Sequence, residues 1–344
     1  MIQENISLKN YNSFGIDANA RFYSTVSSVD ELRELKLMYD HLGLKQLLML
    51  GGGSNILFTD NFNGLVLKNN IGGIQQIGED DTFVYLQAGA GVNWHSFVLH
   101  CIANNLAGVE NLSLIPGNVG ASPMQNIGAY GVEIKDVFHS LQAYHLQENS
   151  LHTFNKTDCA FGYRESIFKN KYKGQFAIVS VIFKLAKQPN YNISYGAIGQ
   201  ELEAMGVKEL SLAAISQAVI NIRSSKLPDP AVIGNAGSFF KNPEVANDFF
   251  KELKTLFPQM VGYDLGNGKT KIAAGWLIEH CGPEVGVSWK GYRVGDAGCH
   301  AKQALVLVNY GNAKGEEIYE LSTAIIVSVK EKYGVLLERE VNII

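Results

Sequence analysis

The segment Leu114–Gly131 limits the possible folds of this chain more than any other stretch. It contains two prolines and four glycines, Gly117, Gly120, Gly128 and Gly131, so no regular helix or strand runs through it. None of its residues is Lys, Arg, Asp or Glu, whereas a disordered linker of this length is usually charged or serine-rich. We therefore predict an ordered loop whose backbone N–H groups closely approach a large, partly apolar ligand such as a cofactor.

The composition is that of an ordinary globular protein, and the length suggests about two domains. The chain has 344 residues, of which 46% are hydrophobic and 18% charged, with a formal net charge of -4. Acidic and basic residues are interspersed, so we expect neither a nucleic-acid partner nor an anionic membrane. No stretch resembles a signal peptide or a membrane span. The four cysteines show no close pairing, which is typical of reduced thiols in the cytosol.

The first half of the chain is predicted to be rich in strands. Residues 94–104 are the exception, because Trp94, Phe97 and Cys101 have the spacing of one helical face. Glu148–Ser150 is predicted to be a hairpin turn. Short apolar runs bounded by turn residues predict strands at 44–50, 56–58, 65–67, 82–88, 137–146, 151–154 and 176–185.

Helices become more frequent after Gln188–Asn190, where we expect a domain boundary. Leu227–Pro230 ends the first of them, since proline cannot continue a helix. The mixture indicates an α+β fold rather than the regular alternation of a doubly wound sheet. Apolar spacing predicts helices at 212–222, 244–256, 271–280 and 318–329, a strand at 305–308 and a closing strand at 334–344.

A second glycine-rich segment, Gly51–Asn55, follows a predicted strand. It is not a dinucleotide fingerprint, because Ile56 occupies the third glycine position and the following residues are strand-like. It also lacks the Gly-Lys-Ser/Thr ending of a P-loop. Alone, the segment is equally consistent with a simple turn. Together with 114–131 it would form a suitable clamp for a pyrophosphate, since backbone N–H groups bind phosphate without a lysine.

Eight segments, in order, resemble the motifs of the UDP-N-acetylenolpyruvoylglucosamine reductase family, in its longer type I branch. They cover the chain from about residue 10 onward and are Asn12–Ile16, Leu50–Phe58, Ile115–Pro123, Gln125–Glu133, Phe161–Lys169, Lys226–Pro230, Gly234–Pro243 and Ala273–Ile278. The resemblance implies a cytoplasmic, monomeric flavoenzyme of peptidoglycan synthesis, and thereby of cell-wall biogenesis, cell shape and cell division.

The resemblance also implies a particular α+β architecture. A two-part FAD-binding domain of the PCMH type, as in vanillyl-alcohol-oxidase-like enzymes, would span residues 17–190. A separate α+β substrate-binding domain would span residues 191–330. Residues 331–344 would form a C-terminal strand that returns to the flavin domain and the active site.

The implied reaction is reduction of UDP-N-acetyl-3-O-(1-carboxyvinyl)-glucosamine to UDP-N-acetylmuramate. NADPH is the co-substrate, non-covalent FAD is the cofactor, and no metal, nucleic acid or membrane takes part. This chemistry requires a guanidinium to hold the enolpyruvyl carboxylate, a group that shares the developing charge, and a proton donor near the α-carbon.

Carried over residue by residue, the resemblance assigns three catalytic positions. Arg164 would hold the carboxylate, Ser238 would donate the proton, and Glu340 would be the C-terminal active-site glutamate. Without the resemblance, Arg164 would be a surface arginine and Ser238 a turn or cap residue. Glu338 would share a strand face with Glu340 and remains an alternative. Arg339 stands where the family usually has proline.

The resemblance further implies two sets of binding residues. The cofactor set is Gly51, Gly52, Gly53, Ser54, Asn55, Pro116, Gly117, Gly120, Ala121, Ser122, Asn126, Gly128 and Gly131. The substrate set is Tyr130, Tyr195, Lys226, Asn242 and Gln303, whose hydroxyl, ammonium and amide groups suit a diphosphate.

Three alternatives remain open. His280–Cys281 and Cys299–His300 contain the ligand types of a zinc site, although such sites usually separate paired ligands by about two to four residues. A flavin-dependent oxidase of a small alcohol would belong to the same superfamily, but no His or Cys occupies a typical covalent-flavin loop position. A non-catalytic nucleotide-binding module would show no bound flavin or no turnover.

Overall fold

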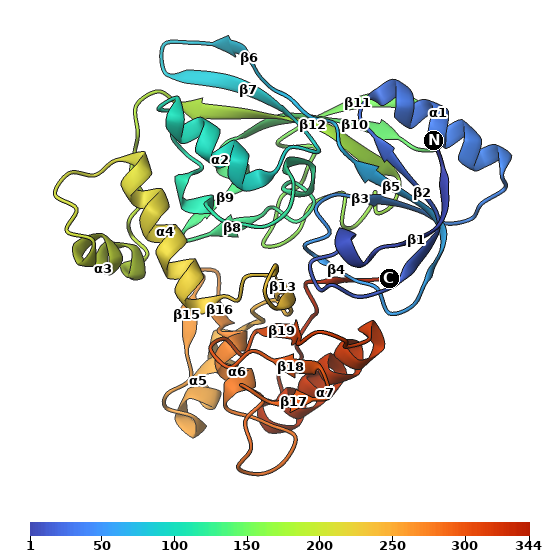
Figure 1. Ribbon diagram of the computed structural model, residues 1–344. Coiled ribbons are helices and arrows are strands. Elements are labelled where there is room, and N and C mark those ends of the chain that lie inside the picture. The colour runs from blue at the N-terminus through green and yellow to red at the C-terminus, as the bar shows by residue number, and fades with distance from the viewer. The chain divides into compact units, whose positions relative to one another are not determined.

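A five-stranded antiparallel sheet is the largest in the computed structural model, which describes residues 1–344 (Figure 1). Its strands, in the spatial order β11-β10-β12-β7-β6, are β11 (Ser150–Asn155), β10 (Phe138–His145), β12 (Phe176–Ala186), β7 (Phe83–Gly89) and β6 (Ile74–Glu79). Helix α2 (Trp94–Ala103) begins after Asn93, whose side chain accepts the Ser96 N–H at 2.9 Å. Its buried face, with Trp94 and Phe97, shares one core with Phe183 of β12.

A second sheet, in the order β1-β2-β5-β3, supports the first glycine segment. Its strands are β1 (Gln3–Ser7), β2 (Asn19–Val26), β5 (Phe62–Asn69) and β3 (Leu47–Leu50). β3 runs parallel to β5 and ends immediately before Gly51. Helix α1 (Val29–His41), capped by Ser28, buries Leu32 and Leu35 against Leu65 and Leu67.

Two helices after β12 form a smaller apolar cluster with the second glycine loop. α3 (Gly196–Ala204) contributes Ile198, and α4 (Leu212–Lys226) contributes Val219 and Ile222. The loop itself contains the short antiparallel pair β8 (Gly128–Ala129) and β9 (Val132–Glu133). Short 3-10 turns lie at Lys9–Tyr11, Glu110–Leu112, Val119–Ala121 and Ile134–Asp136.

The remaining elements follow Lys226, apart from one short strand. A four-stranded sheet contains β13 (Gly234–Ser238), β19 (Val306–Asn309), β18 (Ala297–Cys299) and β17 (Arg293–Val294). A three-stranded sheet contains β14 (Glu244–Ala246), β16 (Lys269–Ile272) and β15 (Gly262–Asp264). The helices are α5 (Asn247–Leu256), α6 (Ala274–Glu279) and α7 (Gly315–Tyr333), and β20 (Asn342–Ile343) pairs parallel with β4 (Ile56–Leu57).

The α+β class predicted from the sequence is confirmed, and three predicted elements are corrected. Residues 244–246 and 269–272 form strands, whereas the sequence predicted helix over 244–256 and 271–280. Thr270 and Ile272 are buried while Lys269 is exposed, which is the period-two pattern of a strand. In the predicted strand 334–344, regular pairing is confined to Asn342–Ile343 and a single bridge from Arg339 to Phe240.

The chain divides into two compact units. Unit 1 comprises Met1–Ile6, Ala20–Gly53 and Asn63–Ser225, and unit 2 comprises Ser7–Asn19, Ser54–Phe62 and Lys226–Ile344. This division places α3 and nearly all of α4 in unit 1, beyond the boundary expected near residue 190. The last strand pairs with Ile56–Leu57, a segment of the predicted flavin domain that lies in unit 2. None of the helices combines the length and the apolar character needed to cross a bilayer.

Candidate functional site

The two glycine-rich loops lie against each other within unit 1. A Cβ atom at Gly52 would be 2.8 Å from the Gly117 Cα atom, and a Cβ atom at Gly120 would be 2.5 Å from the Ala90 Cβ atom. Both distances are shorter than any normal contact, so larger residues would force the backbones apart. Gly53 and Gly117 also have φ angles of +64° and +109°, which glycine adopts without strain.

Backbone donors remain available where these loops meet. The N–H groups of Gly52, Gly53 and Gly117 make no hydrogen bond within the protein. Uncharged N–H groups on closely packed loops suit an anionic pyrophosphate, because they supply positive dipoles without side-chain bulk. The chemistry of this donor set therefore fits the diphosphate of a flavin dinucleotide.

Other residues of the predicted cofactor set have structural partners. The Asn126 side chain is fully buried and donates to Glu133 at 3.1 Å and to the Gly162 carbonyl at 3.0 Å. The buried Ser122 hydroxyl donates to the Val119 carbonyl at 2.7 Å. These side chains shape the loop, whereas Pro116 and Ala121 are exposed on it and Gly131 has a φ of +80°. Ser54 and Asn55 belong to unit 2.

Arg164 lies against the same loop of unit 1. It occupies a turn with a φ of +55°, an uncommon conformation for a residue with a side chain. Its Nη2 atom donates to the Gly128 carbonyl at 2.8 Å, and its guanidinium lies 5.3 Å from the centre of the Tyr163 ring. A Cβ atom at Gly128 would be 3.3 Å from Arg164 Nη1, so the glycine makes room for the guanidinium.

Two predicted substrate residues, Tyr130 and Tyr195, meet beside a residue that the sequence prediction missed. Their rings pack edge to face with centres 5.3 Å apart. Burial raises the pKa of Tyr130, and the nearby charge of Arg223 on α4 counteracts this. A signal existed in the sequence, because Arg223 follows Val219 by four residues and so places a charge on the apolar face of a helix.

In unit 2, Ser238 is presented by an interruption of β13. The pairing of β13 with β19 shifts between Asn235 and Ser238, and Gly237 there has a φ of +69°. The buried Asn235 side chain holds this irregularity by accepting the Gly237 N–H at 2.9 Å. Ser238 is half-buried, and its hydroxyl makes no hydrogen bond with the protein. It is therefore available to a ligand.

The C-terminal segment runs antiparallel to the residues that follow Ser238. The Glu340 N–H donates to the Phe239 carbonyl at 2.8 Å, so the structure brings Glu340 to the strand that carries the serine. Glu338 pairs instead with the buried Lys241, at 2.6 Å between Oε1 and Nζ. This ion pair engages the Glu338 carboxylate.

The unusual Arg339 is anchored on α7. It donates to Ser322 at 2.8 Å and to Thr323 at 2.6 Å, and it lies 4.4 Å from the centre of the Tyr319 ring. Arg339, which stands where the family usually has proline, therefore attaches the backbone between Glu338 and Glu340 to α7 through its side-chain hydrogen bonds.

Two further residues of the predicted substrate set lie at the first turn of α6. The Asn242 Oδ1 atom accepts the Ala274 N–H at 2.9 Å, and a Cβ atom at Gly275 would be 2.9 Å from Gln303 Oε1. Lys226, the last residue of α4, is exposed.

The alternative zinc ligands are engaged elsewhere. The His280 ring stacks on Trp276 with centres 4.1 Å apart, and the Cys299 thiol donates to the Ala304 carbonyl at 2.9 Å. Burial raises the pKa of Cys299 to about 12, which disfavours the thiolate form that binds zinc. Residues 1–344 contain no group of three or more His, Cys, Asp or Glu side chains arranged to hold a metal ion.

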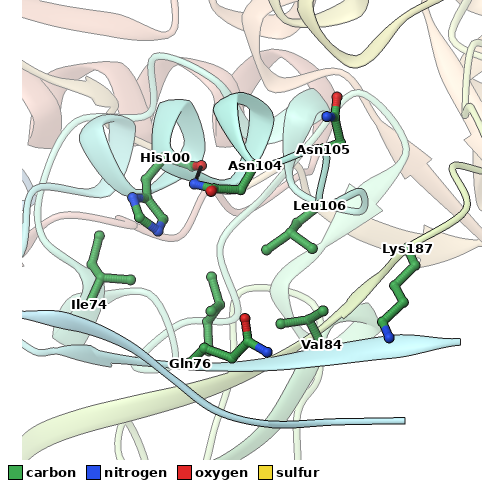
Figure 2. A pocket seen from close by; sticks show the side chains of 9 residues that line it. Ile74, Gln76, Val84, His100, Asn104, Asn105, Leu106 and Lys187 are labelled. Atoms are coloured by element: carbon green, nitrogen blue, oxygen red, sulfur yellow. Dashed lines mark hydrogen bonds between the residues drawn. The ribbon is translucent and has the colours of Figure 1, made fainter. Parts of the chain in front are cut away.

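A separate pocket of about 480 Å³ lies in unit 1 between α2 and the strands β6 and β7 (Figure 2). His100 and Asn104 come from the helix, and Ile74, Gln76 and Val84 come from the strands below it. None of the residues predicted to bind cofactor or substrate lines this pocket.

Comparison with known proteins assigns the chain to a family. Residues 20–149 match an FAD binding domain, and residues 229–344 match the C-terminal domain of UDP-N-acetylenolpyruvoylglucosamine reductase. The chain is 51% identical to the UDP-N-acetylenolpyruvoylglucosamine reductase of Amoebophilus asiaticus, over 100% of this chain and 99% of the relative. The corresponding protein of Flavobacterium johnsoniae is 49% identical, again over 100% of this chain and 99% of the relative.

A solved structure shares the fold. The UDP-N-acetylenolpyruvylglucosamine reductase of Thermus caldophilus superimposes with a TM-score of 0.68 at 22% identity, over 100% of this chain and 99% of that one. The identity to the two sequence relatives extends over the whole chain and is far above what a shared fold alone requires. This chain belongs to the UDP-N-acetylenolpyruvoylglucosamine reductase family.

Proposed function

We propose that this protein reduces UDP-N-acetyl-3-O-(1-carboxyvinyl)-glucosamine to UDP-N-acetylmuramate, a step of peptidoglycan precursor synthesis. NADPH is the reductant and non-covalent FAD the cofactor. The observation that carries the proposal is the 51% and 49% sequence identity, over the full length of this chain, to two UDP-N-acetylenolpyruvoylglucosamine reductases. The alternatives of a small-alcohol oxidase and of a non-catalytic module have no comparable support.

The glycine loops of unit 1 are proposed to hold FAD. The free N–H groups of Gly52, Gly53 and Gly117 would bind its diphosphate, and these three glycines have no side chains that would obstruct it. When bound there, FAD would supply the hydride-transfer chemistry that links NADPH to the methylene carbon of the enolpyruvyl group.

Arg164 is proposed to hold the enolpyruvyl carboxylate. A guanidinium presents two parallel N–H donors, which match the geometry of a carboxylate. Negative charge spreads onto that carboxylate as the double bond is reduced, so a fixed cation stabilises the transition state more than the ground state. The hydrogen bond from Arg164 to the Gly128 carbonyl fixes the guanidinium in advance.

Ser238 is proposed to protonate the α-carbon, and Glu340 to assist it. A serine hydroxyl is a weak acid, but a carbanion-like carbon is a strong base, so proximity and alignment matter more than acidity. Ser238 is half-buried and would supply this hydroxyl. The hydrogen bond from the Glu340 N–H to the Phe239 carbonyl holds the glutamate on the segment that pairs with the residues after Ser238.

The diphosphate and sugar are proposed to contact Tyr130, Tyr195, Lys226, Asn242 and Gln303. Within these, Lys226 supplies the positive charge and Asn242 and Gln303 supply amides at the start of α6. We further propose a monomeric cytoplasmic enzyme with no nucleic-acid or membrane partner. Residues 17–190 would bind the flavin, residues 191–330 the substrate, and residues 331–344 would complete the active site.

Adding one methyl group at Gly52 should weaken FAD binding. In Gly52→Ala the new Cβ would lie 2.8 Å from Gly117 Cα, so the two loops must move apart. We expect affinity to fall by roughly 5- to 150-fold, the equivalent of a typical overpacking penalty. Gly78→Ala on β6 is the control, because a Cβ atom at this exposed position would meet no atom within 4 Å. Titration of the two apoproteins with FAD measures both affinities. Equal affinities would show that the glycine loops do not form the cofactor site.

The function itself is tested by turnover of the purified protein. It should be yellow, should release FAD on denaturation, and should consume NADPH only when the enolpyruvyl sugar nucleotide is present. A colourless protein that cannot be reconstituted with FAD would refute the cofactor assignment. Oxidation of small alcohols without consumption of the sugar nucleotide would instead favour the oxidase alternative.

A further inference from the structure

Lys68 is a half-buried cation that has no carboxylate partner. It lies in β5, and the parallel pairing of β3 with β5 places it opposite Leu50, the last residue before the first glycine segment. Its Nζ atom donates to the Gly51 carbonyl at 2.7 Å, and it forms no ion pair. Burial lowers the pKa of Lys68, and no acidic group opposes this effect. A charge in such surroundings is costly unless an anion compensates it, and the protein supplies none.

This lysine changes the electrostatics of the first glycine segment. The sequence predicted a diphosphate clamp made of backbone N–H groups alone, and the two segments 51–55 and 114–131 indeed contain no lysine. The positive charge comes instead from the neighbouring strand β5, and it reaches the carbonyl side of the loop.

The contact with Gly51 fixes the direction of a donor in the next residue. The Gly51 carbonyl and the Gly52 N–H belong to one planar peptide group, which is trans, as are all peptide bonds of the chain. In a trans peptide the carbonyl and the N–H point in opposite directions. An ammonium held on the carbonyl therefore leaves the Gly52 N–H directed away from Lys68. This N–H is one of the three loop donors that make no hydrogen bond within the protein.

The same contact makes that N–H a stronger donor. A hydrogen bond to the oxygen of a peptide polarises the whole group, and a charged donor has a larger effect than a neutral one. The charge of Lys68 is thus transmitted through one peptide to the place where Gly52 lies against Gly117, whose N–H is also free. The ammonium itself stays on the carbonyl side, so it takes up no space beside the free donors.

A lysine that only fixes a loop does not need these surroundings. Lys254 of α5 makes the same kind of contact, because its Nζ atom donates to the Met260 carbonyl at 2.7 Å, but its side chain is exposed to solvent. Lys68 makes its contact while half-buried and beside free backbone donors. The comparison indicates that the charge of Lys68 serves a bound anion.

We propose that Lys68 is a positioning residue of the FAD site, which orients and polarises the Gly51–Gly52 peptide so that the Gly52 N–H binds the diphosphate. Its charge also attracts the diphosphate through space, since no protein carboxylate neutralises it. This inference rests on the proposed cofactor site, to which it adds a residue outside both glycine loops.

The test is titration of the apoproteins with FAD. Lys68→Met keeps an apolar stem but loses the charge and the donor, so we expect affinity to fall roughly 5- to 30-fold, the effect of a hydrogen bond of ordinary to moderate strength. Lys68→Arg should lose less, because it keeps both the charge and a donor. Lys254→Met is the matched control, since it removes a lysine–carbonyl hydrogen bond of the same length. It should bind FAD as the wild type does.

A second measurement separates this role from stabilisation of the fold. In the FAD-saturated proteins, phosphorus NMR observes the two diphosphate nuclei directly. Their signals should shift in Lys68→Met and stay in place in Lys254→Met. The melting temperature of the Lys68→Met apoprotein should stay close to the wild-type value, because an apolar side chain in place of an uncompensated, partly buried charge costs little stability. Should Lys68→Met fail to fold, Lys68→Gln, which is neutral but polar, gives the same comparison.

Wild-type FAD affinity of a folded Lys68→Met would overturn the inference, and so would a loss of affinity that leaves the phosphorus signals unshifted. Failure of the inference and failure of the proposed function can be told apart, because neither measurement needs turnover. If the wild type reduces the enolpyruvyl sugar nucleotide but Lys68→Met binds FAD normally, only the inference fails. If the wild type binds FAD but does not reduce that compound, the function fails, and the two measurements still decide the role of Lys68.

Discussion

Ser238→Ala is expected to abolish most turnover while leaving the reaction with NADPH intact. The variant loses the one hydroxyl proposed to protonate the α-carbon, so oxidation of the reduced enzyme by the enolpyruvyl sugar nucleotide should slow roughly 10²- to 10⁴-fold. Reduction by NADPH needs no such proton and should keep its rate. Anaerobic rapid mixing, with each half-reaction followed separately in the flavin absorbance, measures both.

The structure predicts that this loss is chemical rather than structural. The Ser238 hydroxyl makes no hydrogen bond in the protein, so its removal should leave the melting temperature within experimental error of the wild type. Ser27→Ala, which changes an exposed serine, serves as the control. Unchanged rates of both half-reactions in Ser238→Ala would show that another group donates the proton.

Arg164→Lys is expected to impair the same half-reaction. An ammonium keeps the charge but cannot present two parallel donors to a carboxylate. We expect the second half-reaction to slow roughly 10²- to 10³-fold, the usual effect of removing a donor that stabilises developing charge. Measured kcat should fall more than KM rises, because the interaction strengthens in the transition state.

The control for this variant is Arg33→Lys on α1, where an exposed arginine pairs with Asp30 at 2.8 Å. It should behave as the wild type, since exposed ion pairs contribute little. Near-normal turnover of Arg164→Lys would demote Arg164 to a structural role, namely its hydrogen bond to the Gly128 carbonyl.

Much of the fold was predictable from the sequence because its periodicities are local. The apolar spacing of Trp94, Phe97 and Cys101 predicted α2, and the long apolar run 176–185 predicted β12. Periodicity failed where short strands adjoin helices. Glu244–Ala246 and Lys269–Ile272 are too short to establish a period of two. They are strands because they pair with each other across more than twenty residues of sequence and because Lys269–Ile272 also pairs with Gly262–Asp264.

The site was predicted only in part, because long-range pairing decides which residues meet. The resemblance named Ser238 and Glu340 and left Glu338 as an alternative, but the sequence did not reveal the ion pair between Lys241 and Glu338, which joins residues distant in sequence. Arg223 was missed for a similar reason. Its position on an apolar helical face was visible in the sequence, but the phenol that it contacts comes from another element.

The most direct test of the central claim is an anaerobic two-step mixing experiment on the wild-type protein. Addition of NADPH should bleach the flavin band, and addition of UDP-N-acetyl-3-O-(1-carboxyvinyl)-glucosamine should then restore it with stoichiometric formation of UDP-N-acetylmuramate. If the band is restored by oxygen or by a carbonyl compound but not by the sugar nucleotide, the account of this protein is wrong.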